Sequence, residues 1–302
     1  MKHFATLTVS RISLAARNKI FLFFSLVMPL VFFFLYSGVF AKGEPHAVAV
    51  LLGPVLSLTV MGSFWGLSAA LVMYREQGIL RRFRLAPVTA SDMLASSIAA
   101  NYLLTLPTIA VELALARWIF HVTQFGNLFS LFGMVTVAVI SFGSLGLVVA
   151  SVTNTMQETQ VICQIIWLAL LFLSGATIPL HSLPRVVQSI SLFLPATYLV
   201  HALQQAMVQS AGFWELRVAF FALAAWAVLA FFIAMQLFRW QPEEKLPRNA
   251  KLWALATAIP FLLLGFWENK YGSLLQETPA IYRSTDSVHS TSPQPAATPA
   301  SR

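Results

Sequence analysis

The stretch VAVLLGPVLSLTVMGSFWGLSAALVMY, residues 48–74, contains no charged side chain and is followed at once by REQGILRRFRLAPVT, residues 75–89. A helix needs about 20 apolar residues to cross the roughly 30 Å hydrocarbon core of a bilayer, because each residue adds about 1.5 Å. The arginines that follow the uncharged run mark a return to water. The pair of segments therefore indicates a helical membrane protein.

The composition of the whole chain agrees with this interpretation. Of the 302 residues, 58% are hydrophobic and 10% are charged, whereas a soluble domain carries about 25% charged residues. The net charge is +8, but the basic residues lie between apolar runs instead of forming a stripe with aromatic side chains, so we expect no nucleic-acid partner. The single cysteine, Cys163, excludes a disulfide within the chain and a metal site built from several cysteines.

Five further apolar runs have the length of a membrane span. With residues 48–74 they predict an all-α membrane protein with six transmembrane helices. The five runs cover residues 20–40, 93–120, 128–152, 161–180 and 216–238.

Two apolar segments allow a second interpretation. Residues 20–40 also fit the apolar region of a signal peptide with cleavage near Val39 and Ala41, although their length and the spans that follow favour a retained anchor. Residues 252–267 are interrupted by Pro260 and are short for a span. They form either a tilted seventh crossing or a helix that lies in the membrane interface.

The positions of the basic residues predict the orientation, since Lys and Arg in short loops remain on the cytoplasmic side. With a cytoplasmic N-terminus, twelve basic residues lie inside and four outside, and the remaining three belong to the tail. We therefore expect a multi-pass protein of the inner (plasma) membrane, surrounded by its lipids. The twelve are Lys2, Arg11, Arg17, Lys19, Arg75, Arg81, Arg82, Arg84, Arg239, Lys245, Arg248 and Lys251, and the four are Lys42, Arg117, Arg185 and Arg217.

The sequence divides into four segments. Residues 1–19 form an amphipathic cytoplasmic leader, residues 20–240 the transmembrane domain, residues 241–268 a linker with the weak apolar segment, and residues 269–302 a Ser-, Thr- and Pro-rich tail that we expect to be disordered. The leader predicts either an interfacial helix on the inner leaflet or a solvated basic segment. Arg11 interrupts its apolar face unless the side chain extends toward the interface.

The loop at residues 75–89 has an internal pattern that a passive basic loop does not need. Ile79, Leu80 and Phe83 recur at helical spacing among arginines, which predicts a short amphipathic helix that Pro87 ends. Such a helix presents apolar and charged side chains to a cytoplasmic partner. The alternative is a basic loop that only fixes the topology.

This loop resembles one in the membrane subunits of the type-2 ABC exporters, where an Arg-Glu-x-Gly-x-Leu stretch precedes a basic and apolar run and a proline. The resemblance covers roughly residues 10–240, with Ile79 and Ala86 at places where threonine is more frequent. It implies that the loop couples a permease to a nucleotide-binding subunit. The residues implied in this coupling are Arg75, Glu76, Gly78, Leu80, Arg81, Phe83 and Pro87.

A second match to these exporters lies after the fifth predicted span. A glycine and several prolines here do not continue a regular spanning helix, and irregular backbone at membrane depth requires cover from protein or water. We therefore expect a re-entrant or outward-facing helical hairpin before the last core span, with an ordinary outer loop as the alternative. The resemblance implies an outer gate that includes Gly175, Pro179, Pro184, Pro195 and Tyr198.

Glu112 is an acidic residue within a predicted span. A carboxylate in hydrocarbon costs at least roughly 2.5 kcal/mol, so such residues usually face a cavity or a partner. This makes Glu112 a candidate residue of a substrate pathway. The alternative places it near the outer interface, in reach of water or of Arg117.

The 302 residues contain no phosphate-binding loop, no zinc-protease motif and no nucleophilic serine motif. We expect no enzyme activity and no cofactor in this chain, with ATP and Mg²⁺ bound by a partner ATPase subunit. The resemblance implies an exporter of amphipathic, drug-like or lipid-like molecules that pairs with a second permease, either a copy or a paralogue. Two alternatives are a membrane scaffold that transports nothing and an ion-driven transporter that uses Glu112.

Overall fold

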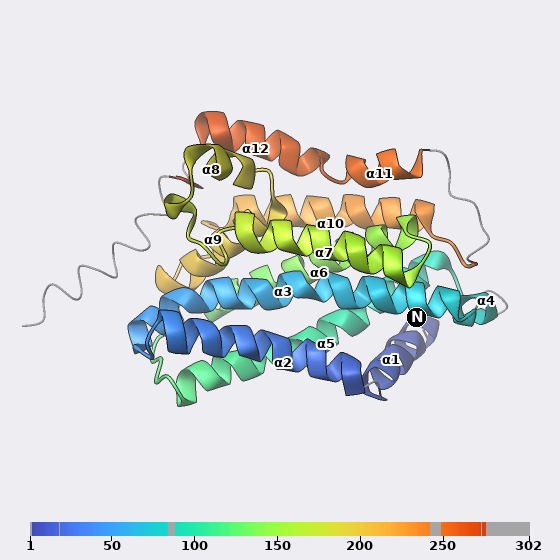
Figure 1. Cartoon of the computed structure of the whole chain (residues 1–302), viewed down its shortest axis with the longest axis horizontal. Coiled ribbons are helices and arrows are strands. Elements are labelled where there is room, and N and C mark those ends of the chain that lie inside the picture. The colour runs from blue at the N-terminus through green and yellow to red at the C-terminus, as the bar shows by residue number, and fades with distance from the viewer. Residues whose placement is uncertain (1, 18, 84–87, 242–248, 273, 276–302) are drawn as a thin grey trace, which may run out of the picture.

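The computed structural model describes residues 2–17, 19–83, 88–241, 249–272 and 274–275. Within these residues every regular element is a helix (Figure 1). In chain order the elements are α1 (Lys2–Arg17), α2 (Lys19–Phe34), the π-helical η1 (Leu35–Phe40), α3 (Pro45–Glu76), α4 (Ile79–Phe83), α5 (Ala90–Trp118), α6 (Leu128–Val152), α7 (Met156–Leu173), the 3₁₀-helical η2 (Leu180–Ser182), α8 (Arg185–Ser191), α9 (Pro195–Val208), α10 (Arg217–Leu237), α11 (Ala250–Ala256) and α12 (Ile259–Tyr271).

Helix α3 lies at the centre of the bundle and contacts α5, α6, α7 and α9. Its contact with α6 is close because Gly146 has no side chain: a Cβ there would lie 2.5 Å from the carbonyl oxygen of Phe64. The hydroxyl of Ser68 donates to the carbonyl of Gly146 over 2.8 Å, which fixes the two helices at this crossing. The buried side chains of α3 then form one apolar core with those of α5, α6 and α9.

The fold class is the predicted one, since the described residues contain six helices long and apolar enough to span a membrane. These six are α3, α5, α6, α7, α10 and Leu252–Tyr271, which combines parts of α11 and α12. The set differs from the predicted one at two places. The run at 20–40 forms α2 and η1, within which Leu26–Phe40 is a shorter apolar helix. The weak segment at 252–267 reaches the length of a span because its helix continues to Tyr271.

Helix α7 corrects the predicted run at 161–180, which was wrong at both ends. The helix begins at Met156 because the side chain of Thr155 accepts a hydrogen bond of 3.2 Å from the third helical N–H. It ends at Leu173, since Gly175 soon afterwards adopts a φ of +87° that a regular helix does not contain.

The two ends of the bundle carry different elements (Figure 1). Helices α1 and α4 lie at one end together with the C-terminal ends of α3, α6 and α10, and we call it the α4 end. Helix α8 and η2 lie at the opposite end, which we call the α8 end. Helix α11 lies toward the α4 end, and α12 continues from it toward the α8 end (Figure 1). The cytoplasmic location of the α4 end stays a prediction.

Helix α1 packs along α5. Leu7 and Thr8 are buried, whereas Val9 and Leu14 remain exposed. Exposed apolar side chains on a basic helix are what an interfacial helix requires. The membrane-interface location of α1 stays a prediction.

Candidate functional site

The candidate coupling site begins where α3 ends. The N–H groups of Gln77 and Gly78 donate to the carbonyls of Met73 and Arg75, each over 3.0 Å, which closes the last turn of the helix. Gly78 has a φ of +67°, in the left-handed region that glycine adopts without steric cost. This left-handed residue lets the chain leave α3 and enter α4 directly, a conformation that favours glycine over most other residues.

Helix α4 is the predicted short amphipathic helix, and its two sides have different surroundings. Leu80 is fully buried in an apolar cluster with Leu71, Met93 and other side chains of α3 and α5. This placement corrects the interpretation of Leu80 as an apolar contact for a partner, because its own bundle already covers it.

The charged side of α4 is not covered by the described part of the bundle. Arg81 and Arg82 are exposed. Phe83 is the last residue of the helix, and Pro87 lies outside the described residues. The helix is therefore attached to the bundle by Leu80 and presents two arginines to its surroundings.

Three consecutive residues at the end of α3 contact three different helices. Arg75 is 2% exposed, and its guanidinium donates to the carbonyls of Ala150, over 2.9 Å, and Thr153, over 2.5 Å. These carbonyls belong to the last turn of α6 and to the residue that follows it, where no helical N–H remains to bind them. The positive charge also lies at the negative end of the α6 dipole. Arg75 thus joins α3 to the end of α6.

Glu76 joins α3 to α7. Its Oε1 accepts a hydrogen bond of 2.8 Å from the backbone N–H of Met156, the first residue of α7. A carboxylate at a helix N-terminus binds an N–H that has no helical partner and lies at the positive end of the dipole. Arg75 and Glu76 therefore bind both sides of the α6–α7 turn, residues 153–155.

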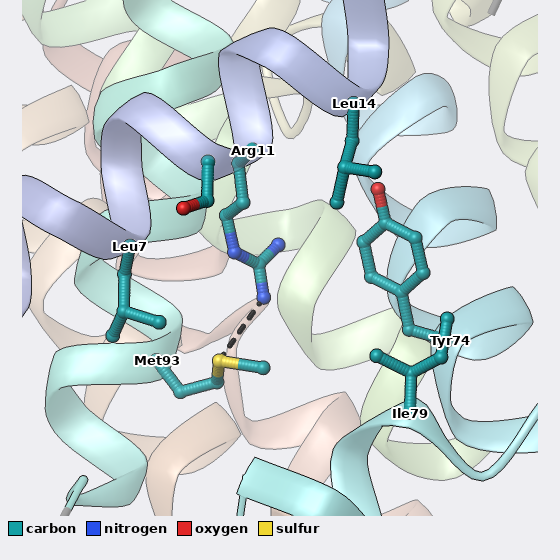
Figure 2. A pocket seen from close by; sticks show the side chains of 7 residues that line it. Leu7, Arg11, Leu14, Tyr74, Ile79 and Met93 are labelled. Carbon is teal, nitrogen blue, oxygen red and sulfur yellow. Dashed lines mark hydrogen bonds between the residues drawn. The ribbon is translucent and has the colours of Figure 1, made fainter.

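Tyr74 joins α3 to α1, as Figure 2 shows. The guanidinium carbon of Arg11 lies 5.6 Å from the centre of the Tyr74 ring, and its Nη2 lies 3.2 Å from the sulfur of Met93. Burial lowers the pKa of Arg11 to about 10, with the Tyr74 side chain opposing the shift. Arg11 is therefore still charged at neutral pH, and its guanidinium lies between Tyr74 of α3 and Met93 of α5.

A small pocket separates α1 from α4 at this place (Figure 2). Leu7, Arg11 and Leu14 come from α1, Tyr74 from α3, Ile79 from α4 and Met93 from α5. The partly buried Ile79 thus also faces the bundle. Helix α4 therefore contacts α1 across this pocket as well as the end of α3.

The residues predicted to form an outer gate lie at the α8 end. Pro179 and Pro184 directly precede η2 and α8, and Pro195 is the first residue of α9, all positions where a missing N–H breaks no helical hydrogen bond. Helices α8 and α9 meet at an angle of 92°. This bend agrees with the predicted hairpin, whose re-entry into the membrane stays a prediction.

Tyr198 is buried within the corner between α8 and α9. Its hydroxyl donates to the carbonyl of Leu192 over 2.8 Å, and the hydroxyl of Thr197 donates to the carbonyl of Ser191 over 2.6 Å. The Tyr198 ring also lies 5.6 Å from the ring of Phe261 on α12. Tyr198 therefore holds the corner together and contacts the segment that follows α10.

Comparison with known proteins shows the family of this chain. Residues 2–208 match the model of a family described as ABC-2 type transporter, which is more than half of the 302 residues. The chain belongs to the ABC-2 type transporter family. The relatives that this chain matches include proteins named as transport permeases.

Three relatives illustrate the similarity. The inner membrane transport permease YhhJ of Escherichia coli (strain K12) is 26% identical over 186 residues, 61% of this chain and 48% of the relative. The linearmycin resistance permease protein LnrN of Bacillus subtilis (strain 168) is 21% identical over 182 residues, 60% and 47%. The ABC transporter G family member 20 of Dictyostelium discoideum is 30% identical over 171 residues, 56% and 23%. The chain spans about half the length of the two bacterial relatives.

Glu112 lies deep in the core of this ABC-2 subunit. Its side chain is fully buried, and Oε1 accepts a hydrogen bond of 2.7 Å from the hydroxyl of Thr59 on α3. Oε2 has no hydrogen-bond partner among the described residues. Arg117, the alternative partner, donates instead to the carbonyl of Val122 over 3.0 Å.

The side chains that could bind a metal ion do not form a cluster in the part of the chain that the structure describes. Among the described residues, no three His, Cys, Asp or Glu side chains lie close enough together to bind a metal ion. Cys163 is buried in the apolar core.

The sequence did not point to Tyr74, Thr153 or Met156 as partners of the coupling loop, because their roles depend on contacts between distant segments.

Proposed function

We propose that this chain is the membrane-spanning permease of an ATP-driven exporter whose ATPase is a separate subunit that binds α4. The observation that carries the proposal is the contact of Tyr74, Arg75 and Glu76 with α1, α6 and α7, respectively. A force applied to α4 acts next on the end of α3. It then reaches three helices through buried or hydrogen-bonded contacts instead of being lost in a flexible loop.

The docking surface in this proposal is the charged side of α4. Arg81 and Arg82 are exposed, and Leu80 fixes the helix to the bundle. A surface with acidic side chains on the ATPase fits two adjacent arginines, and such complementarity speeds and orients association. ATP and Mg²⁺ would be held by that subunit. Its closure on ATP would bias the permease between two states by no more than its difference in affinity for them.

The proposed orientation of the chain in the membrane follows from the proposed contact between α4 and the ATPase. An ATPase in the cytoplasm requires the α4 end, with the N-terminus, to lie on the cytoplasmic side of the inner membrane. The basic residues support this orientation, because loops at this end carry the majority of them. The α8 end, with the proposed gate around Gly175 and Tyr198, would then face outward.

The proposed substrate is an amphipathic molecule of drug-like or lipid-like character, exported from the cytoplasm. The relative LnrN is named for resistance to linearmycin, which supports export of this class. Glu112 is proposed as a residue of the pathway, since its buried carboxylate has one hydrogen bond, to Thr59.

A second permease, a copy or a paralogue, completes the proposal. Helix α7 supports it, because Val161, Ile165, Leu168 and Phe172 are exposed at spacings of three and four residues and form one apolar stripe. Twofold symmetry is the commonest arrangement among protein oligomers, and it would place the α7 stripes of two copies against each other. Lipid would cover the rest of the apolar surface.

The docking proposal is tested by reversing the charge of α4. Arg81→Glu combined with Arg82→Glu should abolish copurification of the ATPase in mild detergent and leave membrane insertion intact. Arg217→Glu, at the opposite end of the bundle, is the matched control and should retain the ATPase. Retention of the ATPase by the double variant would contradict the proposal.

The same preparation separates the alternatives. A membrane scaffold would recover no ATPase, and deletion of the chain would not change efflux. An ion-driven transporter would move substrate without ATP and stop when the membrane potential is removed. The exporter proposal requires ATP-dependent efflux that disappears with either subunit.

A further inference from the structure

Arg239 lies beyond the region matched by the family, just after α10, and is buried at the α4 end. Its guanidinium donates to the carbonyls of Ser151, over 3.2 Å, and Thr153, over 2.8 Å, and to Oδ1 of Asn154, over 3.0 Å. All three acceptors belong to the end of α6 and to the α6–α7 turn. Arg239 therefore joins α10 to the segment that Arg75 and Glu76 bind from α3.

Arg75 and Arg239 both donate hydrogen bonds to backbone carbonyls at the end of α6. Arg75 binds the carbonyls of Ala150 and Thr153, and Arg239 binds those of Ser151 and Thr153. Three carbonyls without helical partners are thus bound by two cations at the negative end of the helix dipole. Both guanidinium groups donate to the carbonyl oxygen of Thr153, so a displacement of this residue changes a contact of each.

We propose that Arg239 is a positioning residue of the coupling site: it holds the α6–α7 turn where Arg75 and Glu76 bind it and extends the coupling path from α4 to α10. The inference rests on the proposed function for its role in transport. The contact itself is independent of any partner.

The apolar packing of α10 on α6 does not need Arg239. Phe142 of α6 and Trp226 of α10 lie edge to face with ring centres 5.5 Å apart, and the hydroxyl of Ser141 donates to the carbonyl of Leu223 over 2.6 Å. These contacts lie in the middle of the two helices. Loss of Arg239 should therefore loosen the turn without separating α10 from α6.

The first experiment uses the purified permease alone and measures backbone hydrogen exchange. Arg239→Gln should speed exchange at residues 153–158 and at residues 74–80 by about tenfold, because a hydrogen-bonded buried cation is lost. Arg217→Gln is the matched control, since this arginine donates to the carbonyl of Trp214 at the other end of α10. Faster exchange confined to residues 238–241 would overturn the inference.

The second experiment adds the copurified ATPase and measures substrate moved per ATP hydrolysed. Arg239→Gln should still bind the ATPase but lower this ratio about fivefold or more, within the range of allosteric couplings. Arg239→Lys, which keeps the charge but not the forked geometry, should recover part of it. An unchanged ratio in Arg239→Gln would overturn the inference. Failure to recover any ATPase would instead contradict the proposed function, and the exchange measurement would still decide the role of Arg239.

Discussion

Arg75 and Arg239 donate to the same backbone oxygen, that of Thr153, although they lie 164 positions apart in the chain. Two like charges meet there because the end of α6 offers carbonyls that no helical N–H binds. The buried ends of α3 and α10 are thereby attached to one turn. This relationship makes the α4 end a connected unit, and the predictions below follow from it.

Arg75→Gln should destabilise the permease by about 2 kcal/mol, because two buried carbonyls lose a charged donor. Arg81→Gln, six residues later and exposed, should change stability by about 0.5 kcal/mol or less. Thermal unfolding of both variants in the same detergent checks the difference. Equal unfolding temperatures would show that the Arg75 contacts with α6 contribute nothing to the folded state.

Gly78→Val should weaken binding of the ATPase by distorting the entry to α4, since a side chain at a φ of +67° costs roughly 1–2 kcal/mol. A steric clash with neighbouring residues is not the reason for the weaker binding, because a Cβ at Gly78 would meet no atom within 4 Å. Gly78→Asn is the matched variant and should retain binding, as asparagine tolerates this conformation. Copurification of the ATPase with each variant provides the measurement, and equal loss for both would exclude backbone conformation as the reason.

The helix Leu252–Tyr271 should cross the membrane. Gly265 allows it to lie against the corner of α8 and α9, because a Cβ there would lie 2.9 Å from the carbonyl oxygen of Leu192. A reporter fused after residue 272 should then lie on the opposite side of the membrane from one fused after residue 241. Reporters on the same side would place this helix in the interface.

Tyr198→Phe should lower stability by about 1 kcal/mol, since it removes the hydrogen bond to Leu192 and keeps the ring contact with Phe261. Tyr198→Ala should cost more, about 3–5 kcal/mol, through loss of the buried ring. Unfolding temperatures of the two variants test the order. A gate residue that only lines a path would give altered transport at unchanged stability.

The predictable part of the fold was the part determined by local sequence. The run at 128–152 coincides with α6, because it is uninterrupted and Asn127 directly before it accepts a hydrogen bond of 3.1 Å from the N–H of Ser130. The helical spacing of Ile79, Leu80 and Phe83 likewise predicted α4. Hydrophobic periodicity and helix caps act over a few residues, so a single sequence reveals them.

The unpredictable part depended on contacts between distant segments. Leu80 was expected to face a partner, but periodicity shows only that a helix has an apolar side and not what covers it. The arginines gave no sign of which would be buried: Arg75 and Arg239 bind α6, whereas Arg81 is exposed. Charge counting predicted their shared end of the bundle and not their different roles.

A photo-cross-linking residue placed at Arg82 in living cells tests the central claim most directly, because it reports what touches α4 without detergent. The account predicts a covalent product with a nucleotide-hydrolysing subunit, and no such product when the same residue replaces Arg217. Products at neither position, or equal products at both, would contradict the claim that α4 is the docking site of an ATPase.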